Sequence, residues 1–173
     1  MDVFAREAGL RHRKGLPLGA AVERFAAKGE NLVSLPYVVK GMDLSLSGLL
    51  TAATALLRTG ECRLEDLCYS LQENAFSMVT EVTERALAHT EKEEVLLTGG
   101  VAANKRLQSM LAVIAEEHNA RFSVVPLEFA TDNGAMIAWT GTLAYKHGLV
   151  TPVDESYVKL RWRVDKVDVP WIQ

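Results

Sequence analysis

The feature that most constrains the fold of this chain is an apolar run that ends in two glycines and leads directly into an amphipathic segment. Residues 94–100, EVLLTGG, predict a buried strand followed by a tight turn. In the next segment, 102–119, the apolar residues Leu107, Leu111 and Ile114 recur on one face of a helix. A strand and a helix are therefore expected in direct succession.

The same order of elements repeats further along the chain. Residues 121–126, RFSVVP, predict a second buried strand closed by Pro126, and residues 131–148 predict a helix that ends at Gly148. Strands that alternate with helices through short connections pair in parallel, with right-handed crossovers. The sequence therefore predicts the α/β class.

The first half of the chain is predicted to be mainly helical. The opening segment, residues 1–9, either begins at Asp2 as a helix cap or continues an element of a longer protein. The longest helix is expected over residues 64–89, where one buried stripe consists of Leu67, Leu71, Ala75, Met78, Val82 and Ala86. The other expected elements are a helix over 20–28 ended by Gly29, strands over 32–39 and 42–47, a helix over 48–58 capped by Ser47 and followed by Gly60, and a half-exposed strand over 159–169.

Charge and composition exclude several functional classes. The 173 residues include 19 basic and 22 acidic side chains, a net charge of −3, whereas a chain that binds nucleic acid over its whole surface is usually basic. Any contact with RNA is therefore expected to be local or shared with partners. No apolar run approaches the roughly 20 residues that span a bilayer, and charges occupy the place of a signal peptide's apolar core. Cys62 and Cys68 are too few for a disulfide framework, so a cytoplasmic protein with structural cysteines is expected.

The turn at Gly99 and Gly100 is the first candidate for ligand binding. Glycines let a ligand approach the backbone closely, and the N-terminus of the following helix offers free N–H groups that suit a phosphate or an adenosine. The turn matches neither the Walker loop nor the dinucleotide fingerprint, and such turns are also common as purely structural features. Asn104, in the first turn of this helix, either contacts a nucleoside or is a polar surface residue of the helix without a ligand.

Asp132 and Asn133 open the last predicted helix and form the second candidate. After a parallel strand they are expected at the carboxyl edge of the sheet, where open α/β folds bind ligands. Asp132 is either a helix cap or a carboxylate that faces a metal or a phosphate. The histidines are scattered along the chain, at His12, His89, His118 and His147. Further metal ligands are therefore expected outside this chain, and no pattern of a catalytic nucleophile or of paired carboxylates is present.

Six segments together carry a resemblance to a known family. They are DVFAREAGL, KGMDLSLSGLL, GECRLEDLCYSLQE, TGGVAANKRLQ, FATDNGAMIAWTG and RWRVDKVDV. In this order they resemble the TsaD/OSGEP family of tRNA N6-adenosine threonylcarbamoyltransferases, the catalytic subunit of the KEOPS complex, in its archaeal and eukaryotic branch. The resemblance implies an actin-like ATPase fold of two lobes, related to sugar kinases and Hsp70 ATPase domains. It also implies transfer of the threonylcarbamoyl group from threonylcarbamoyl-adenylate to N6 of the adenosine 3′ of the tRNA anticodon.

The resemblance also implies site residues. On the nucleotide side these are a ribose-contacting aspartate, a glycine and a glutamate that line the nucleoside, two glycines that approach through their backbone, and an asparagine: Asp2, Gly19, Glu23, Gly99, Gly100 and Asn104. The segment RHRKGLPLGAAVE, which contains the first glycine and the glutamate, departs from the family's usual Pro-Gly-Gly-Pro loop. The metal ligand implied is Asp132, for an iron or zinc ion near the phosphates of ATP or of the adenylate.

By this resemblance residues 1–173 are a single C-terminal actin-like lobe with a helical insertion at about 47–90. The family's N-terminal lobe, with its H-x-x-x-H metal histidines and phosphate-binding loop, is not in this chain. Weak metal binding and no transferase activity are therefore expected of the chain alone. The implied partners are tRNA and KEOPS subunits, including a small kinase and a dimerisation subunit, with no membrane; a lone lobe also has an apolar surface for homo-association.

Two alternatives belong to other functional classes. One is a non-catalytic nucleotide-binding or dimerisation module of the same actin-like superfamily, against which the retention of Asp2, Asn104 and Asp132 argues. The other is a sugar-kinase or chaperone ATPase lobe, since a fold does not fix a function. The six segments favour the tRNA enzyme over both.

Overall fold

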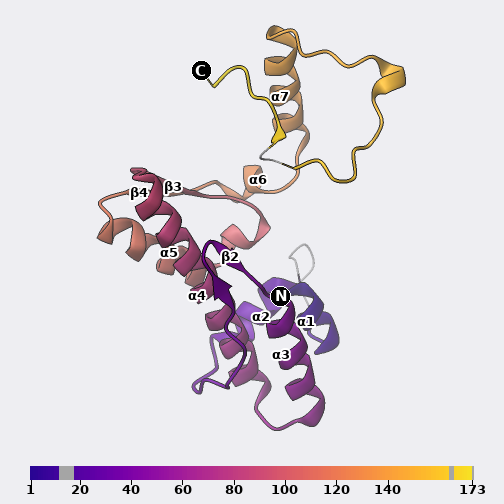
Figure 1. Ribbon diagram of the computed structural model, residues 1–173. Coiled ribbons are helices and arrows are strands. Elements are labelled where there is room, and N and C mark those ends of the chain that lie inside the picture. Colours follow the sequence, from indigo (N-terminus) through magenta and orange to yellow (C-terminus); the bar gives the residue numbers. More distant parts are fainter. Residues whose placement is uncertain (12–17, 164–165, 173) are drawn as a thin grey trace. The chain divides into compact units, whose positions relative to one another are not determined.

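The computed structural model describes residues 1–11, 18–163 and 166–172, which form two units, Met1–Thr131 and Asp132–Gln173 (Figure 1). In the first unit the elements are α1 (Asp2–Glu7), α2 (Gly19–Ala26), β1 (Val39–Lys40), β2 (Asp43–Leu44), α3 (Ser47–Thr59), α4 (Leu64–Thr90), β3 (Glu94–Leu97), the 3₁₀ turn η1 (Gly100–Ala103), α5 (Lys105–Glu117), β4 (Arg121–Val124) and α6 (Leu127–Ala130). The second unit contains α7 (Gly134–Lys146) and the 3₁₀ turn η2 (Val153–Glu155). None of the described helices is long and apolar enough to cross a membrane.

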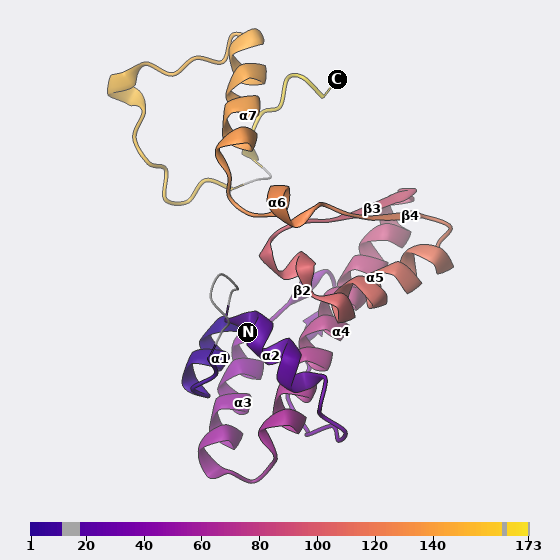
Figure 2. The same ribbon diagram turned by 180° about the vertical axis from the view of Figure 1, so that it is seen from behind.

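Helix α4 organises the first unit. It contacts α2, α3 and α5, and in both views α5 lies beside it (Figures 1 and 2). Arg106 near the start of α5 pairs with Glu73, and His118 after its end lies 3.4 Å from Glu84, so the two helices run in the same direction. The start of α5 is therefore fixed against the middle of α4.

The buried stripe predicted for α4 is confirmed over most of its length. Leu67 and Met78 are 1% and 0% exposed. Leu71 and Ala75 are also buried, whereas Val82 and Ala86 are only half-buried. On α5 the predicted inner residues Leu107, Leu111 and Ile114 are buried in the same core. Full burial of a leucine-sized side chain contributes about 1.5–3 kcal/mol, so this contact between helices is a main source of stability.

The segment 30–38 lies along α4 and gives backbone N–H groups to side chains of that helix. The hydrogen bonds are Glu30 N to Asp66 Oδ1 (2.8 Å), Asn31 N to Asp66 Oδ1 (3.1 Å), Val33 N to Ser70 Oγ (2.7 Å) and Val38 N to Met78 Sδ (3.3 Å). The strand predicted over 32–39 is therefore wrong except at its last residue, because donors that a neighbouring strand would need are bound by α4. The strand predicted over 42–47 is reduced to Asp43–Leu44, which pairs antiparallel with Val39–Lys40.

Asp66 gives the stability of this contact a pH dependence. Its hydrogen bonds from the backbone N–H groups of Glu30 and then Asn31 lower the pKa of the Asp66 carboxyl. Because the folded pKa lies below the unfolded value of about 3.9, the ionised carboxylate stabilises the fold above that pH and loses this contribution as the pH falls through the folded pKa. We expect Asp66→Asn to be less stable than wild type at pH 7. The difference between the urea midpoints of the two proteins should narrow below about pH 4. The exposed Asp43→Asn is the matched control, and a gap that stays constant down to acid pH would contradict this origin.

The N-cap predicted for α3, and the Asp2 cap that was one of two alternatives for the opening segment, are both wrong for local reasons. Leu46, not Ser47, is the N-cap of α3, and the Ser47 hydroxyl lies 3.1 Å from that of Ser45 instead of capping the helix. Gly60 ends α3 in the left-handed conformation as predicted, with φ +68°. Asp2 does not cap α1, because the N-cap is Met1.

Gly29 has a different role from the one predicted. Helix α2 already ends at Ala26. A Cβ at Gly29 would lie 2.4 Å from Cβ of Tyr69 and 2.7 Å from the carbonyl oxygen of Glu65. The glycine therefore permits close approach of the chain to α4 rather than ending a helix.

Strands β3 and β4 pair in parallel, with Glu94 opposite Arg121 and Leu97 opposite Val124, which confirms the predicted pairing and the α/β class. The prediction that these strands are buried holds for one face only. Leu97 and Phe122 pack on the core, whereas Leu96 is 65% exposed. Among the described helices, α5 contacts both strands.

The second unit differs from its prediction at the tail. Helix α7 ends before Gly148 as predicted, and that glycine has φ +75°. The described residues 159–163 and 166–169 form turns and irregular chain instead of the predicted strand, and positions 164–165 lie outside the described residues. The Lys159 ammonium lies 4.9 Å from the centre of the Trp162 ring, so neighbouring basic and aromatic side chains stack locally rather than alternate across a strand.

Candidate functional site

The Gly99–Gly100 turn connects β3 to α5 through η1 rather than directly. Gly99 has φ +95° and ψ 170°, a conformation that strongly favours glycine. Apart from neighbouring residues along the chain, no described atom lies within 4 Å of a Cβ built on either glycine, so the backbone here is open to approach from outside. The helix predicted from residue 102 therefore begins later, at Lys105.

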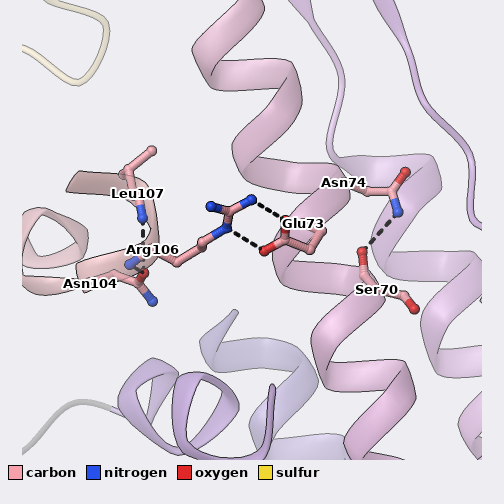
Figure 3. A network of polar contacts seen from close by, with 6 residues as sticks. All are labelled: Ser70, Glu73, Asn74, Asn104, Arg106 and Leu107. Atoms are coloured by element: carbon pink, nitrogen blue, oxygen red, sulfur yellow. Dashed lines mark hydrogen bonds and ion pairs between the residues drawn. The ribbon is translucent and has the colours of Figure 1, made fainter. Parts of the chain in front are cut away.

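Asn104 is the N-cap of α5. Its Oδ1 accepts hydrogen bonds from the backbone N–H groups of Arg106 (2.9 Å) and Leu107 (3.2 Å) (Figure 3). These donors fix which end of the amide faces the helix, so Nδ2 points the other way and donates to Oε1 of Gln72 at 3.0 Å. The described residues give the second hydrogen on Nδ2 no acceptor. Asn104 therefore caps the helix and still has one N–H to donate to a ligand.

Glu23 on α2 reaches the same helix end. Its Oε1 accepts a hydrogen bond of 2.9 Å from the backbone N–H of Lys105, the residue after Asn104. A carboxylate at the N-terminus of a helix is stabilised by the free N–H groups and the partial positive charge there. This contact brings Glu23 beside Asn104, so two of the residues that the resemblance implies lie together.

Asp2 contacts the start of α2. Its Oδ1 accepts a hydrogen bond of 2.5 Å from the backbone N–H of Gly19. A Cβ on Gly19 would lie 2.8 Å from that oxygen, so the carboxylate can sit this close only to a glycine. Gly19 and Glu23 lie one turn apart on α2, so these contacts link Asp2, through α2, to the N-terminus of α5. The intervening residues 12–17, which include His12, lie outside the described residues.

Three residues next to the candidate site were not predicted from the sequence: Gln72, Glu73 and Arg106. Arg106 donates to Glu73 from Nε (2.8 Å) and Nη2 (2.7 Å), a two-pronged ion pair between α5 and α4 (Figure 3). These hydrogen bonds raise the pKa of Arg106. The only signal in the sequence is that polar Gln72 and Glu73 follow directly on the apolar Leu71 of the stripe.

A cavity of about 370 Å³ lies between the start of α5 and the segment that follows β4. It is lined by Ala102, Ala103, Lys105, Gln108, Val124, Val125, Pro126, Leu127 and Ala130. Gln108 spans its polar side, donating to the Ala102 carbonyl (2.6 Å) and accepting from Lys105 Nζ (3.1 Å). A hollow of this volume with a few fixed polar groups suits a small organic ligand.

Asp132 lies at the start of the second unit, as an exposed carboxylate. The cap of α7 is Asn133, whose Oδ1 accepts from the Met136 N–H at 3.0 Å, so Asp132 is not needed for capping. Helix α6 separates Asp132 from β4, so it does not directly follow the strand as predicted. Among the described residues no three His, Cys, Asp or Glu side chains gather as a metal site. These residues therefore do not form a metal site by themselves.

The cysteines fit the structural role predicted for them. Cys68 is buried, and this burial, with nearby Glu65, raises the pKa of its thiol to about 12. Burial also raises the pKa of Cys62. A thiol that stays protonated is a poor nucleophile, so the arrangement can bind and orient a ligand but supplies no thiolate.

Comparison with known proteins identifies the family. The TsaD family, tRNA N6-adenosine threonylcarbamoyltransferase, matches residues 1–139. Enzymes of that name from Archaeoglobus fulgidus and Thermococcus kodakarensis are 55% and 52% identical over 171 residues, which are 99% of this chain and 51% of each relative. A probable bifunctional tRNA threonylcarbamoyladenosine biosynthesis protein from Methanocaldococcus jannaschii is 56% identical over all of this chain and 31% of its own length. The chain thus spans about half the length of the first two relatives.

A solved structure supports the fold. The crystal structure of T. kodakarensis HypF matches 90% of this chain and 21% of its own chain, with a TM-score of 0.61 and 24% identity. At that identity the likeness shows the fold alone, and it is consistent with an actin-like type. With the α/β architecture and the match over residues 1–139, the chain belongs to the TsaD family of tRNA N6-adenosine threonylcarbamoyltransferases.

Proposed function

We propose that this chain serves as the C-terminal, nucleotide-binding lobe of a tRNA N6-adenosine threonylcarbamoyltransferase. The reaction moves the threonylcarbamoyl group from threonylcarbamoyl-adenylate to N6 of the adenosine 3′ of the anticodon. The observation that carries the proposal is the set of contacts around the N-terminus of α5, where Glu23 and the capping Asn104 meet. The lobe comprises residues 1–173, with a helical insertion at about 47–90.

The adenylate is already activated, so the lobe needs no nucleophile of its own. Its part is to bind and orient the nucleotide, which removes much of the entropic barrier to transfer. The free N–H of Asn104 donates to an oxygen or nitrogen of the nucleotide, and the Gly99–Gly100 backbone approaches its phosphates. Asp2, Gly19 and Glu23 border the nucleoside.

The metal and partners extend beyond this chain. Asp132 contributes one ligand to an iron or zinc ion, and the other ligands come from outside these residues. When bound, such an ion polarises the acyl-phosphate region. The partners are tRNA and subunits of a KEOPS complex, among them a small kinase and a dimerisation subunit, in the cytoplasm. By this proposal the chain alone binds metal weakly and does not transfer the threonylcarbamoyl group.

A chimera tests the proposal. We expect the A. fulgidus enzyme to keep its transferase activity when its matched half, 55% identical, is replaced by this chain. The chain alone is expected to give no modified adenosine in the same assay, read by mass spectrometry of digested tRNA. A chimera carrying Asp132→Asn is the matched control and should lose activity. A folded chimera that binds nucleotide without transferring would favour the non-catalytic module instead.

A further inference from the structure

Among the residues that the structure describes, Gln72 on α4 is the one side chain that holds the amide of Asn104 from outside its own helix. It lies in the same unit as α5 and is 5% exposed. Its Oε1 accepts the hydrogen bond from Asn104 Nδ2 at 3.0 Å. The capping bonds fix where Oδ1 lies, but an amide can still tilt about them. The bond to Gln72 removes that freedom.

The direction of the second Nδ2 hydrogen follows from the first. The two N–H bonds of an amide lie in one plane at a fixed angle, so holding one of them aims the other. A donor aimed in advance loses less entropy when a ligand binds. We propose that Gln72 is a positioning residue, which aims the free N–H of Asn104 at the nucleotide. This inference rests on the proposed function, since it deepens the role given there to Asn104.

The neighbouring ion pair provides a built-in comparison. Glu73, one residue along α4, binds the guanidinium of Arg106, the second residue of α5, and so fixes the two helices to each other. Only the backbone N–H of Arg106, and not the ion pair, reaches the Asn104 side chain (Figure 3). If Gln72 served only to dock the helices, then losing either contact would have the same effect. If it positions the amide, only the loss of Gln72 changes the ligand contact.

The experiment uses the untruncated 173-residue chain, with ATP as the probe. Affinity is measured by titration, and the side-chain amide signal of Asn104 is followed by ¹H–¹⁵N NMR. We expect Gln72→Leu to weaken ATP binding roughly threefold to tenfold, the range of one hydrogen bond, and to shift that signal in the absence of ATP. Gln72→Glu keeps an acceptor at the same reach and should restore the amide signal, although its negative charge near the phosphates weakens ATP binding by itself. Glu73→Gln should leave both near wild type.

The possible results distinguish a failure of the positioning role of Gln72 from a failure of the proposed nucleotide site. Wild-type affinity and an unmoved amide signal in Gln72→Leu would overturn the positioning role, and so would an equal loss of affinity in Glu73→Gln. If the side-chain amide signal of Asn104 in wild type does not shift when ATP is added up to millimolar concentration, the proposed nucleotide site is overturned instead. Should the leucine variant not fold, Gln72→Ser, which is small and polar, takes its place in every arm.

Discussion

Asn104→Asp is expected to lose about tenfold or more in affinity for ATP while the fold remains nearly as stable as wild type. Aspartate is as good an N-cap as asparagine, so its carboxylate still accepts from the N–H groups of Arg106 and Leu107. It cannot donate, however, and it places a negative charge near the phosphates. A hydrogen bond to a charged group contributes about 1.5–3 kcal/mol, which converts to roughly tenfold or more in affinity. Titration with ATP and urea denaturation measure the two effects separately.

Asn104→Ala is the companion variant. It loses the cap as well as the donor, so its stability should fall by about 1 kcal/mol in addition to the loss of affinity. Equal ATP affinity in wild type and Asn104→Asp would show that the amide only caps α5. The proposed contact between Asn104 and the nucleotide would then be withdrawn.

Phe4→Ala is expected to have the largest effect on stability, a loss of about 3–5 kcal/mol. Phe4 is 0% exposed in the core of the first unit, and α1 packs through it against α2 and α3. Since domains of this size are stable by only about 5–15 kcal/mol, this loss is a large share of the total. Asp2 lies on the same short helix, so its bond to Gly19 should weaken as well.

The adjacent Val3→Ala is the control for that variant. Val3 is 51% exposed, so its truncation should change the free energy of unfolding by no more than about 0.5 kcal/mol. Urea denaturation followed by circular dichroism measures both variants. Similar midpoints for the two would mean that α1 is not anchored in the core as the structure describes.

Helices with a strong apolar period were predictable from the sequence. The stripe through Leu67 and Met78 and the inner face of α5 follow from spacing alone, because burial along a helix repeats every three to four residues. The parallel pairing of β3 and β4 followed from the order of elements. Segment 32–39 failed for a reason that lies elsewhere in the chain. Its β-favouring residues are real, but their N–H groups are bound by side chains of α4, more than thirty residues away.

The candidate site was predictable only in part. Glycines and an asparagine at a helix start carry a recognisable signal, so Gly99, Gly100 and Asn104 could be selected from the sequence. Whether Asn104 capped or contacted a ligand could not be decided, because the answer depends on which atoms its neighbours occupy. For Gln72 the sequence offers only its polar character directly after the apolar stripe residue Leu71, and a single polar residue on a long helix is ordinary. Its importance arises only where α4 meets α5.

The close approach at Gly29 has an evolutionary consequence. Every replacement of a glycine adds at least a Cβ, and here that atom would meet Cβ of Tyr69 and the carbonyl of Glu65. A smaller residue at position 69 would not remove both obstacles, because one is backbone and the other a Cβ that any residue except glycine also carries. No single substitution elsewhere therefore relieves both close contacts at residue 29. In a lineage that keeps this helix contact, a substitution at residue 29 requires the backbone to shift, so it is expected to be selected against.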